Sequence, residues 1–180
     1  MALCIIGCGN IDRGDDAAGL LVVRRLRAIG AEAFGVEVAE QSGGNFSLMD
    51  CWRGSEHVIL VDATAPSGTP GQVRVWNSDT NPWPKDVFHC STHAFGVNET
   101  VELARVLNRL PQTLLIYGIE GKQFSFGAPL SPEVERSVES AAQQLFELIR
   151  TTKGSHPAGA KPYPKSGRGR DGSPTLNPSE

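Results

Sequence analysis

The apolar and polar positions of the chain follow two periods, one typical of buried strands and one typical of amphipathic helices. Short apolar runs predict strands at residues 2–6, 36–39, 57–62, 72–76 and 114–119. Apolar residues three and four positions apart predict helices at residues 17–26, 46–52, 97–107 and 132–150. Because strands and helices take turns along the chain, the pattern predicts an α/β fold, with a mostly parallel sheet between two layers of helices.

The predicted strand at residues 72–76 differs from the others. It follows the strand at residues 57–62 after a loop, with no helix between them. A parallel crossover needs a dozen or more residues, so we expect this strand to be antiparallel and to lie at an edge of the sheet. The expected architecture is therefore a three-layer α/β/α sandwich around a five-stranded mixed sheet.

Composition divides the 180 residues into an acidic domain and a basic tail. Residues 151–180 hold five Lys and Arg against two Asp and Glu, a net charge of +3, whereas residues 1–150 hold 12 against 18, a net charge of −6. The tail also contains five Pro and five Gly, so we expect it to be disordered and residues 1–150 to form one domain. The acidic balance argues against a nucleic-acid-binding protein, and no segment has the roughly 20 apolar residues of a membrane span.

The four cysteines, Cys4, Cys8, Cys51 and Cys90, indicate a reducing compartment. None of them has CxxC spacing, and a domain of this size does not depend on disulfides. The N-terminal stretch lacks the basic residues and the apolar segment of a signal peptide. We therefore expect reduced thiols in a soluble cytoplasmic protein.

Three segments with ionisable side chains converge on one edge of the predicted sheet. Asp15 and Asp16 follow the glycine-rich turn after the first strand, Asp62 ends the central strand, and His93 precedes the helix at residues 97–107. In open α/β sheets, ligands bind at the carboxyl ends of the strands. Two carboxylates and an imidazole at this edge would suit a divalent transition metal with open coordination positions.

Each of these residues also has an ordinary structural interpretation. Asp15 and Asp16 could cap a helix, Asp62 could form a turn, and His93 could be a partly exposed loop residue. A nucleotide site is disfavoured, because Asp12 stands where the dinucleotide fingerprint needs its third glycine and the P-loop sequence is missing. The carboxylates after this turn would also repel a phosphate.

Short motifs occur in a defined order through the predicted domain. They are Gly7-Cys8-Gly9-Asn10, Arg13-Gly14-Asp15-Asp16 with Gly19, Val61-Asp62-Ala63, Pro70-Gly71, Ser91-Thr92-His93, Leu110-Pro111, Gly118-Ile119-Glu120 and Leu130-Ser131-Pro132-Glu133-Val134. Together they resemble the [NiFe]-hydrogenase maturation proteases, endopeptidases that trim the C-terminus of the hydrogenase large subunit after nickel insertion. Each motif is short, but the ordered set covers nearly the whole domain.

The resemblance implies a phosphorylase/hydrolase-like fold and a nickel-recognition site. The ligands, which would also be the catalytic residues, fall on Asp16, Asp62 and His93. The nickel would be carried by the substrate, a [NiFe]-hydrogenase large-subunit precursor, and we expect the protein to act as a monomer. The roles of Asp15, as a general base or a supporting residue, and of Glu40, the nearest acidic residue after the second strand, stay open.

Two functions are compatible with these residues. In the first, the protein is an endopeptidase that removes the C-terminal extension of the precursor after nickel insertion. In the second, it is a non-catalytic, nickel-dependent checkpoint protein that binds the precursor and leaves cleavage to another enzyme; a nucleotide-binding enzyme is a more distant alternative. The sequence shows no G-x-S-x-G nucleophile motif, and it does not separate metal-assisted from carboxylate-assisted, aspartic-type cleavage.

Overall fold

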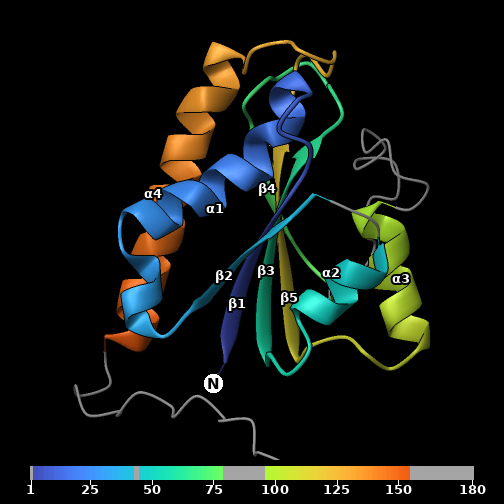
Figure 1. The fold of residues 1–180 in the computed structure, drawn as a ribbon, viewed down its shortest axis with the longest axis vertical. Helices are drawn as coiled ribbons and strands as arrows, with labels where there is room; N and C mark the ends of the chain where they lie inside the picture. Colours follow the sequence, from blue (N-terminus) through green and yellow to red (C-terminus); the bar gives the residue numbers. More distant parts are fainter. Residues whose placement is uncertain (1, 43–44, 79–95, 155–180) are drawn as a thin grey trace, which may run out of the picture.

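The protein folds into three layers, with one five-stranded sheet between two layers of helices (Figure 1). The computed structural model describes residues 2–42, 45–78 and 96–154 of the chain. The strands are β1 (Leu3–Cys8), β2 (Glu37–Gln41), β3 (His57–Thr64), β4 (Val73–Asn77) and β5 (Thr113–Glu120). The helices are α1 (Ala18–Ala28), α2 (Asn45–Cys51), α3 (Val97–Val106) and α4 (Pro132–Lys153), with short 3-10 helices at Gly14–Ala17 and Ala31–Phe34. The predicted α/β/α sandwich is confirmed.

The sheet has the strand order β2-β1-β3-β5-β4. Neighbours among β2, β1, β3 and β5 pair in parallel, whereas β4 pairs antiparallel with β5 at the edge. This confirms the antiparallel edge strand expected from the missing crossover helix. The carboxyl ends of the four parallel strands consequently meet at one side of the sheet, which we call the carboxyl edge.

Two apolar clusters fill the spaces on either side of the sheet. On the α1/α4 face, strand residues such as Ile59 and Val61 pack with residues of helices α1 and α4. On the α2/α3 face, residues such as Val58 and Leu60 pack with residues of α2 and α3. Because successive side chains of a strand point to opposite faces, the even-numbered residues of β3 lie on the α2/α3 face. This alternation decides which face receives the polar residues at the strand's end.

Helix α1 lies unusually close to the sheet because two glycines face each other. A Cβ atom at Gly19 would lie 2.2 Å from the carbonyl oxygen of Val61 and 2.3 Å from that of Cys8. A Cβ atom at Gly7 would lie 2.1 Å from the carbonyl oxygen of Gly19. No larger residue fits at either position, and this contact holds the turn before α1 against the ends of β1 and β3.

Some predicted boundaries were wrong by two or three residues. Strand β1 continues to Cys8, β3 continues past Asp62 to Thr64, and α4 continues past Arg150 to Lys153. Strand ends that carry Gly, Cys, Asp or Thr lack an apolar signal, yet pairing with neighbouring strands keeps them extended: β3 stays in register with β5 as far as Thr64 and Glu120. Among the helices of the described residues, none has both the length and the apolar character needed to cross a membrane.

Candidate functional site

Asp62 lies near the end of β3, on the α2/α3 face of the sheet. Its side chain is buried, with 4% of the residue exposed, and its Oδ1 atom accepts a hydrogen bond of 2.9 Å from the backbone N–H of Ala63. The strand supplies this position because β3 is paired with β1 as far as Val61 and with β5 through Asp62 to Thr64. Asp62 is therefore a buried carboxylate held on rigid backbone at the carboxyl edge.

Asp16 reaches the same edge from the turn after β1. It lies in the 3-10 helix Gly14–Ala17 and is 3% exposed. The turn closes on it tightly: the Asn10 N–H donates to the carbonyl oxygen of Asp16 over 3.2 Å, and a Cβ atom at Gly9 would lie 1.9 Å from that oxygen. On its other side, a guanidinium nitrogen of Arg13 lies 3.9 Å from the Asp16 Oδ2 atom. The Gly-Cys-Gly-Asn turn thus serves to place a carboxylate.

Asp16 and Asp62 are close enough to affect each other's ionisation. Burial, the negative charge of Asp16 and, in the opposite direction, the Ala63 N–H together raise the pKa of Asp62 to about 8. Two buried carboxylates disfavour each other's charged form unless a cation or a donor lies between them. The pair confirms that the turn and the central strand meet, and its chemistry fits a divalent cation.

The thiol of Cys8, on the neighbouring strand, faces the same pair. Burial raises its pKa well above the usual range, and the charges of Asp62, Cys51 and Asp16 raise it further. The thiol is therefore held protonated, and a protonated thiol is a poor nucleophile. Cys8 acts as a small apolar residue in the core, and Cys4, Cys8 and Cys51 are all free.

His93, the third predicted ligand, lies outside the described residues, as do Cys90 and the Ser91-Thr92 motif that precede it. Within residues 2–42, 45–78 and 96–154, no three His, Cys, Asp or Glu side chains are grouped so that they could hold a metal ion. The described residues thus include two of the three predicted ligands, Asp16 and Asp62, and the assignment of all three as metal ligands stays a prediction.

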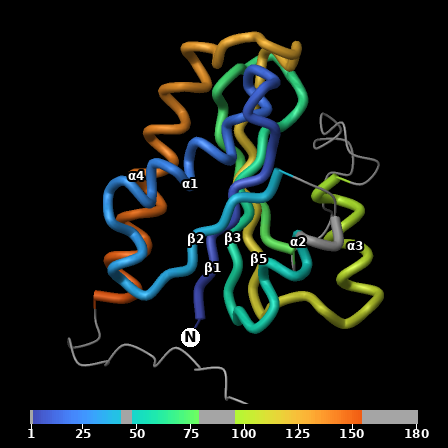
Figure 2. Tube along the Cα trace, in the orientation of Figure 1, coloured from blue at the N-terminus to red at the C-terminus, as the bar shows by residue number. Residues whose placement is uncertain are grey.

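Asp15 has a different role from its neighbour Asp16. It is fully buried, and its carboxylate accepts hydrogen bonds from the N–H groups of Lys122, Gln123 and Ser131 and from the Ser131 hydroxyl, over 2.7 to 3.0 Å. Burial alone would raise its pKa, but these donors outweigh that effect and hold the pKa below its usual value. Figure 2 shows the segment between β5 and α4 passing over the turn that carries Asp15. Asp15 therefore joins two loops and is not free to act as a general base.

The same contact determines how α4 begins. Ser131 occupies the N-cap position of the helix, yet its side chain makes no capping hydrogen bond. Its hydroxyl donates to Asp15 instead, over 2.8 Å. The carboxylate of Asp15 is the preferred acceptor, because a charged acceptor forms the stronger hydrogen bond.

Replacing Asp15 by asparagine is expected to lower the free energy of unfolding by about 2 kcal/mol. The amide nitrogen of asparagine cannot accept the hydrogen bonds that backbone N–H groups donate to the Asp15 carboxylate in the wild type. The melting temperature should fall by about 4–8 °C. Asp12→Asn is the matched control, because Asp12 is exposed in the same loop. Thermal unfolding of the two variants side by side measures the difference, and equal melting temperatures would contradict the role given to Asp15.

Glu40 lies away from the site. It comes two residues after Val38, which packs on the α1/α4 face, so Glu40 is on the opposite face of the sheet from Asp62. Its carboxylate is paired with Arg24, at 2.8 Å, and with Arg27, both of helix α1. These side chains hold the pKa of Glu40 below its usual value, the hydrogen bond of Arg24 being the largest effect. Glu40 thus ties β2 to α1.

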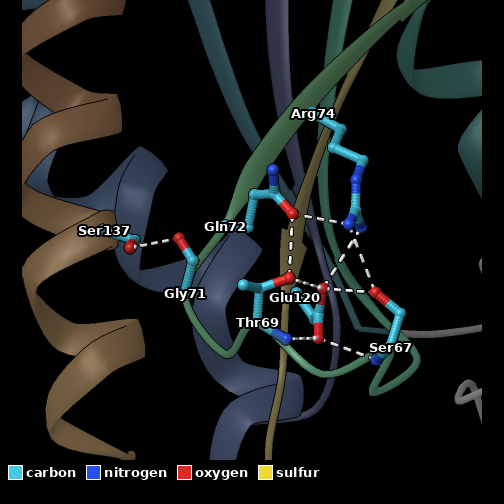
Figure 3. Close-up of polar contacts among 7 residues, drawn as sticks. All are labelled: Ser67, Thr69, Gly71, Gln72, Arg74, Glu120 and Ser137. Carbon is cyan, nitrogen blue, oxygen red and sulfur yellow. Dashed lines mark hydrogen bonds and ion pairs between the residues drawn. The ribbon is translucent and has the colours of Figure 1, made fainter.

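A second buried carboxylate network, which the sequence did not reveal as such, lies at the end of β5. Glu120 is fully buried and accepts hydrogen bonds from the N–H and hydroxyl of Ser67, from the N–H of Thr69 and from the guanidinium of Arg74 (Figure 3). Burial opposes ionisation of Glu120, but these donors lower its pKa to about 2. The sequence does contain one signal for Glu120: it is an acidic residue directly after an apolar stretch, the same pattern that singled out Asp62. Glu120 fixes the loop that follows β3.

Comparison with known proteins identifies the family of this chain. A family model described as HycI, hydrogenase maturation protease, matches residues 20–148, which is more than half of the chain. The chain belongs to the hydrogenase maturation protease family. It is therefore an endopeptidase by family, and the nucleotide-binding alternative has no support: the buried Asp15 and Asp16 occupy the turn where a phosphate would bind.

The relatives of this maturation protease are distant but extend over most of its length. Protein FrxA of Pyrococcus furiosus is 30% identical over 145 residues, which are 76% of this chain and 97% of that protein. The hydrogenase 2 maturation protease of Escherichia coli is 23% identical over 151 residues, 83% of this chain and 92% of that protein.

Solved structures share the fold. The endopeptidase HybD from E. coli superposes with a TM-score of 0.67 at 22% identity, covering 84% of this chain and 94% of that one. HycI from Thermococcus kodakarensis superposes with a TM-score of 0.64 at 19% identity, covering 83% and 92%. The family match begins at Leu20, after Asp16, so the assignment of Asp16 depends on the geometry described above.

Proposed function

We propose that this maturation protease removes the C-terminal extension of a [NiFe]-hydrogenase large-subunit precursor after nickel insertion. The observation that carries the proposal is the pair of buried carboxylates, Asp16 and Asp62, at the carboxyl edge of the sheet. A peptidase acting by a serine or cysteine nucleophile would not need such a pair. A peptidase that recognises a metal in its substrate would need it, because carboxylates are ligands for the metal.

Nickel in this proposal belongs to the substrate. Asp16, Asp62 and His93 would offer it two carboxylates and an imidazole, ligands that nickel accepts but that do not select it over zinc. Selectivity would therefore come from thiolates of the precursor that already hold the metal. The metal would orient the precursor's C-terminal segment and polarise the scissile carbonyl group or an attacking water.

The protein's own residues would provide a fixed, desolvated binding position. Asp62 stands on a strand paired on both sides, and Asp16 is held by the turn that Gly9 and Asn10 close. Preorganised anionic groups in a buried site attract a cation more strongly than exposed ones, because little solvent screens the charges. Asp15 supports this arrangement without contacting the metal.

The proposal extends to the setting in which the protein works. We propose a monomer in the cytoplasm, in which residues 1–150 form the catalytic domain and residues 151–180 take no part in cleavage. The free thiols of Cys4, Cys8 and Cys51 support a reducing compartment. Helix α4 continues to Lys153, so the proposed catalytic domain would include the first few residues after Arg150.

Purified protein is expected to shorten the nickel-loaded precursor and to leave the nickel-free precursor intact. The products are weighed by intact-protein mass spectrometry, with the two precursor forms prepared in parallel and incubated for equal times. A nickel-loaded precursor that binds the protein but keeps its full mass would contradict the proposal and favour the non-catalytic checkpoint function. Equal cleavage of both forms would contradict the role of nickel.

A further inference from the structure

Thr64, the last residue of β3, has a buried hydroxyl group without a hydrogen-bond partner among the described residues. The residue is 1% exposed. Its Oγ1 atom has no hydrogen-bond partner in the part of the chain that the structure describes. Buried hydroxyl groups in folded proteins are almost always paired, since an unpaired one lowers stability. An exception at this position needs an explanation.

The hydroxyl lies beside the proposed site. Thr64 comes two residues after Asp62 on the same strand, so both side chains are on the α2/α3 face at the carboxyl edge. Two residues of a strand span about 7 Å. Thr64 is the outer of the two positions, where the strand ends and the loop begins.

The groups around Thr64 are already committed to other contacts. Its register partner on β5 is Glu120, whose carboxylate is filled by donors from Ser67, Thr69 and Arg74, as Figure 3 shows. The other neighbour on β5 is Gly118, which has no side chain; a Cβ atom there would lie 2.5 Å from the Thr64 methyl carbon. The Thr64 carbonyl oxygen accepts from the N–H of Gly121 over 3.0 Å. Among the described residues, these neighbours therefore offer the Thr64 hydroxyl no hydrogen-bond partner.

We propose that Thr64 is a substrate-binding residue, whose hydroxyl donates a hydrogen bond to a backbone carbonyl oxygen of the precursor's C-terminal segment. The inference rests on the proposed function and adds a contact to it. An extended peptide presents carbonyl groups on one side every two residues, at the same spacing of about 7 Å that separates Asp62 from Thr64. An extended segment that ran alongside β3 past Asp62 would therefore present a carbonyl oxygen near Thr64.

The test compares Thr64→Val, Thr64→Ser and the wild-type protein on the nickel-loaded precursor. Valine keeps the branched shape and removes only the hydroxyl. KM is therefore expected to rise about 3- to 10-fold with kcat unchanged, because the variant loses one neutral hydrogen bond that is equally strong in the enzyme–substrate complex and in the transition state. Serine keeps the hydroxyl and should restore KM. Thr113→Val, at the start of β5 on the opposite edge of the sheet, is the matched control and should behave as the wild type.

Thermal unfolding provides the second measurement. Removing an unpaired buried hydroxyl should leave the melting temperature of Thr64→Val equal to or above that of the wild type. An unchanged KM for Thr64→Val would overturn the inference, and so would a clear fall in its melting temperature, which would show that the hydroxyl is structural. If the wild type binds the precursor without cleaving it, the proposed function fails while the inference stays testable: calorimetric titration should then show a Kd for Thr64→Val about 3- to 10-fold above the wild-type value.

Discussion

Replacing Asp62 by asparagine is expected to slow processing of the nickel-loaded precursor by at least about 100-fold, because changes in groups that only support a metal ligand already cost about 10- to 100-fold. Asparagine has nearly the same size but cannot release a proton to bind a cation as a carboxylate, so the site would lose one of its two proposed carboxylate ligands. Because burial and the charge of Asp16 raise the pKa of Asp62 to about 8, ionised Asp62 opposes folding at pH 7. The melting temperature of the variant should therefore be equal to or above that of the wild type.

Asp50→Asn makes the same chemical change on an exposed carboxylate of α2 and serves as the control. It should process the precursor at the wild-type rate. Asp16→Asn and His93→Ala extend the series to the other two predicted ligands, each with an expected loss of processing and little change in melting temperature. Wild-type processing by Asp62→Asn, or a fall of its melting temperature that accounts for the lost activity, would show that Asp62 has a structural role only.

Replacing Glu120 by glutamine is expected to lower the free energy of unfolding at pH 7 by about 3 kcal/mol. That value corresponds to the difference between the usual glutamate pKa of 4.5 and the folded-state pKa of about 2. Glutamine would turn an amide nitrogen toward the donors of Ser67, Thr69 and Arg74, and the loop after β3 would lose its anchor. Urea unfolding, followed by the fluorescence of the buried Trp52, measures the change.

The same variant has a characteristic pH dependence. The folded-state pKa of Glu120 is depressed, so its stabilising contribution is fully present above about pH 4.5 and is lost as the pH falls toward about 2. The difference between wild type and Glu120→Gln should shrink over that range. Glu147→Gln, on the exposed surface of α4, is the control and should change the free energy of unfolding by less than about 0.5 kcal/mol. A difference that stays constant from pH 7 to pH 3 would contradict the assignment.

Two adjacent aspartates show what sequence reasoning could and could not reach. Asp15 and Asp16 have the same chemistry and the same local pattern, and the sequence left the role of Asp15 open. In the structure, Asp15 binds the segment before α4, whereas Asp16 lies with Asp62. The difference depends on donors more than 100 positions away along the chain, at Lys122, Gln123 and Ser131, which no local pattern reports.

The sequence by itself determined the layers, the antiparallel edge strand and the edge of the sheet at which the candidate residues Asp16 and Asp62 lie. These features follow from the periods of the apolar residues and from the length of each connection, which are local properties of the chain. Only the tertiary structure decided which surroundings each carboxylate has. Donors from distant segments stabilise the charged forms of Asp15, Glu40 and Glu120, whereas Asp62 is buried close enough to Asp16 for that charge to raise its pKa. The role of a buried charge depends on what surrounds it in three dimensions, since its ionisation is set by desolvation and by neighbouring charges and donors.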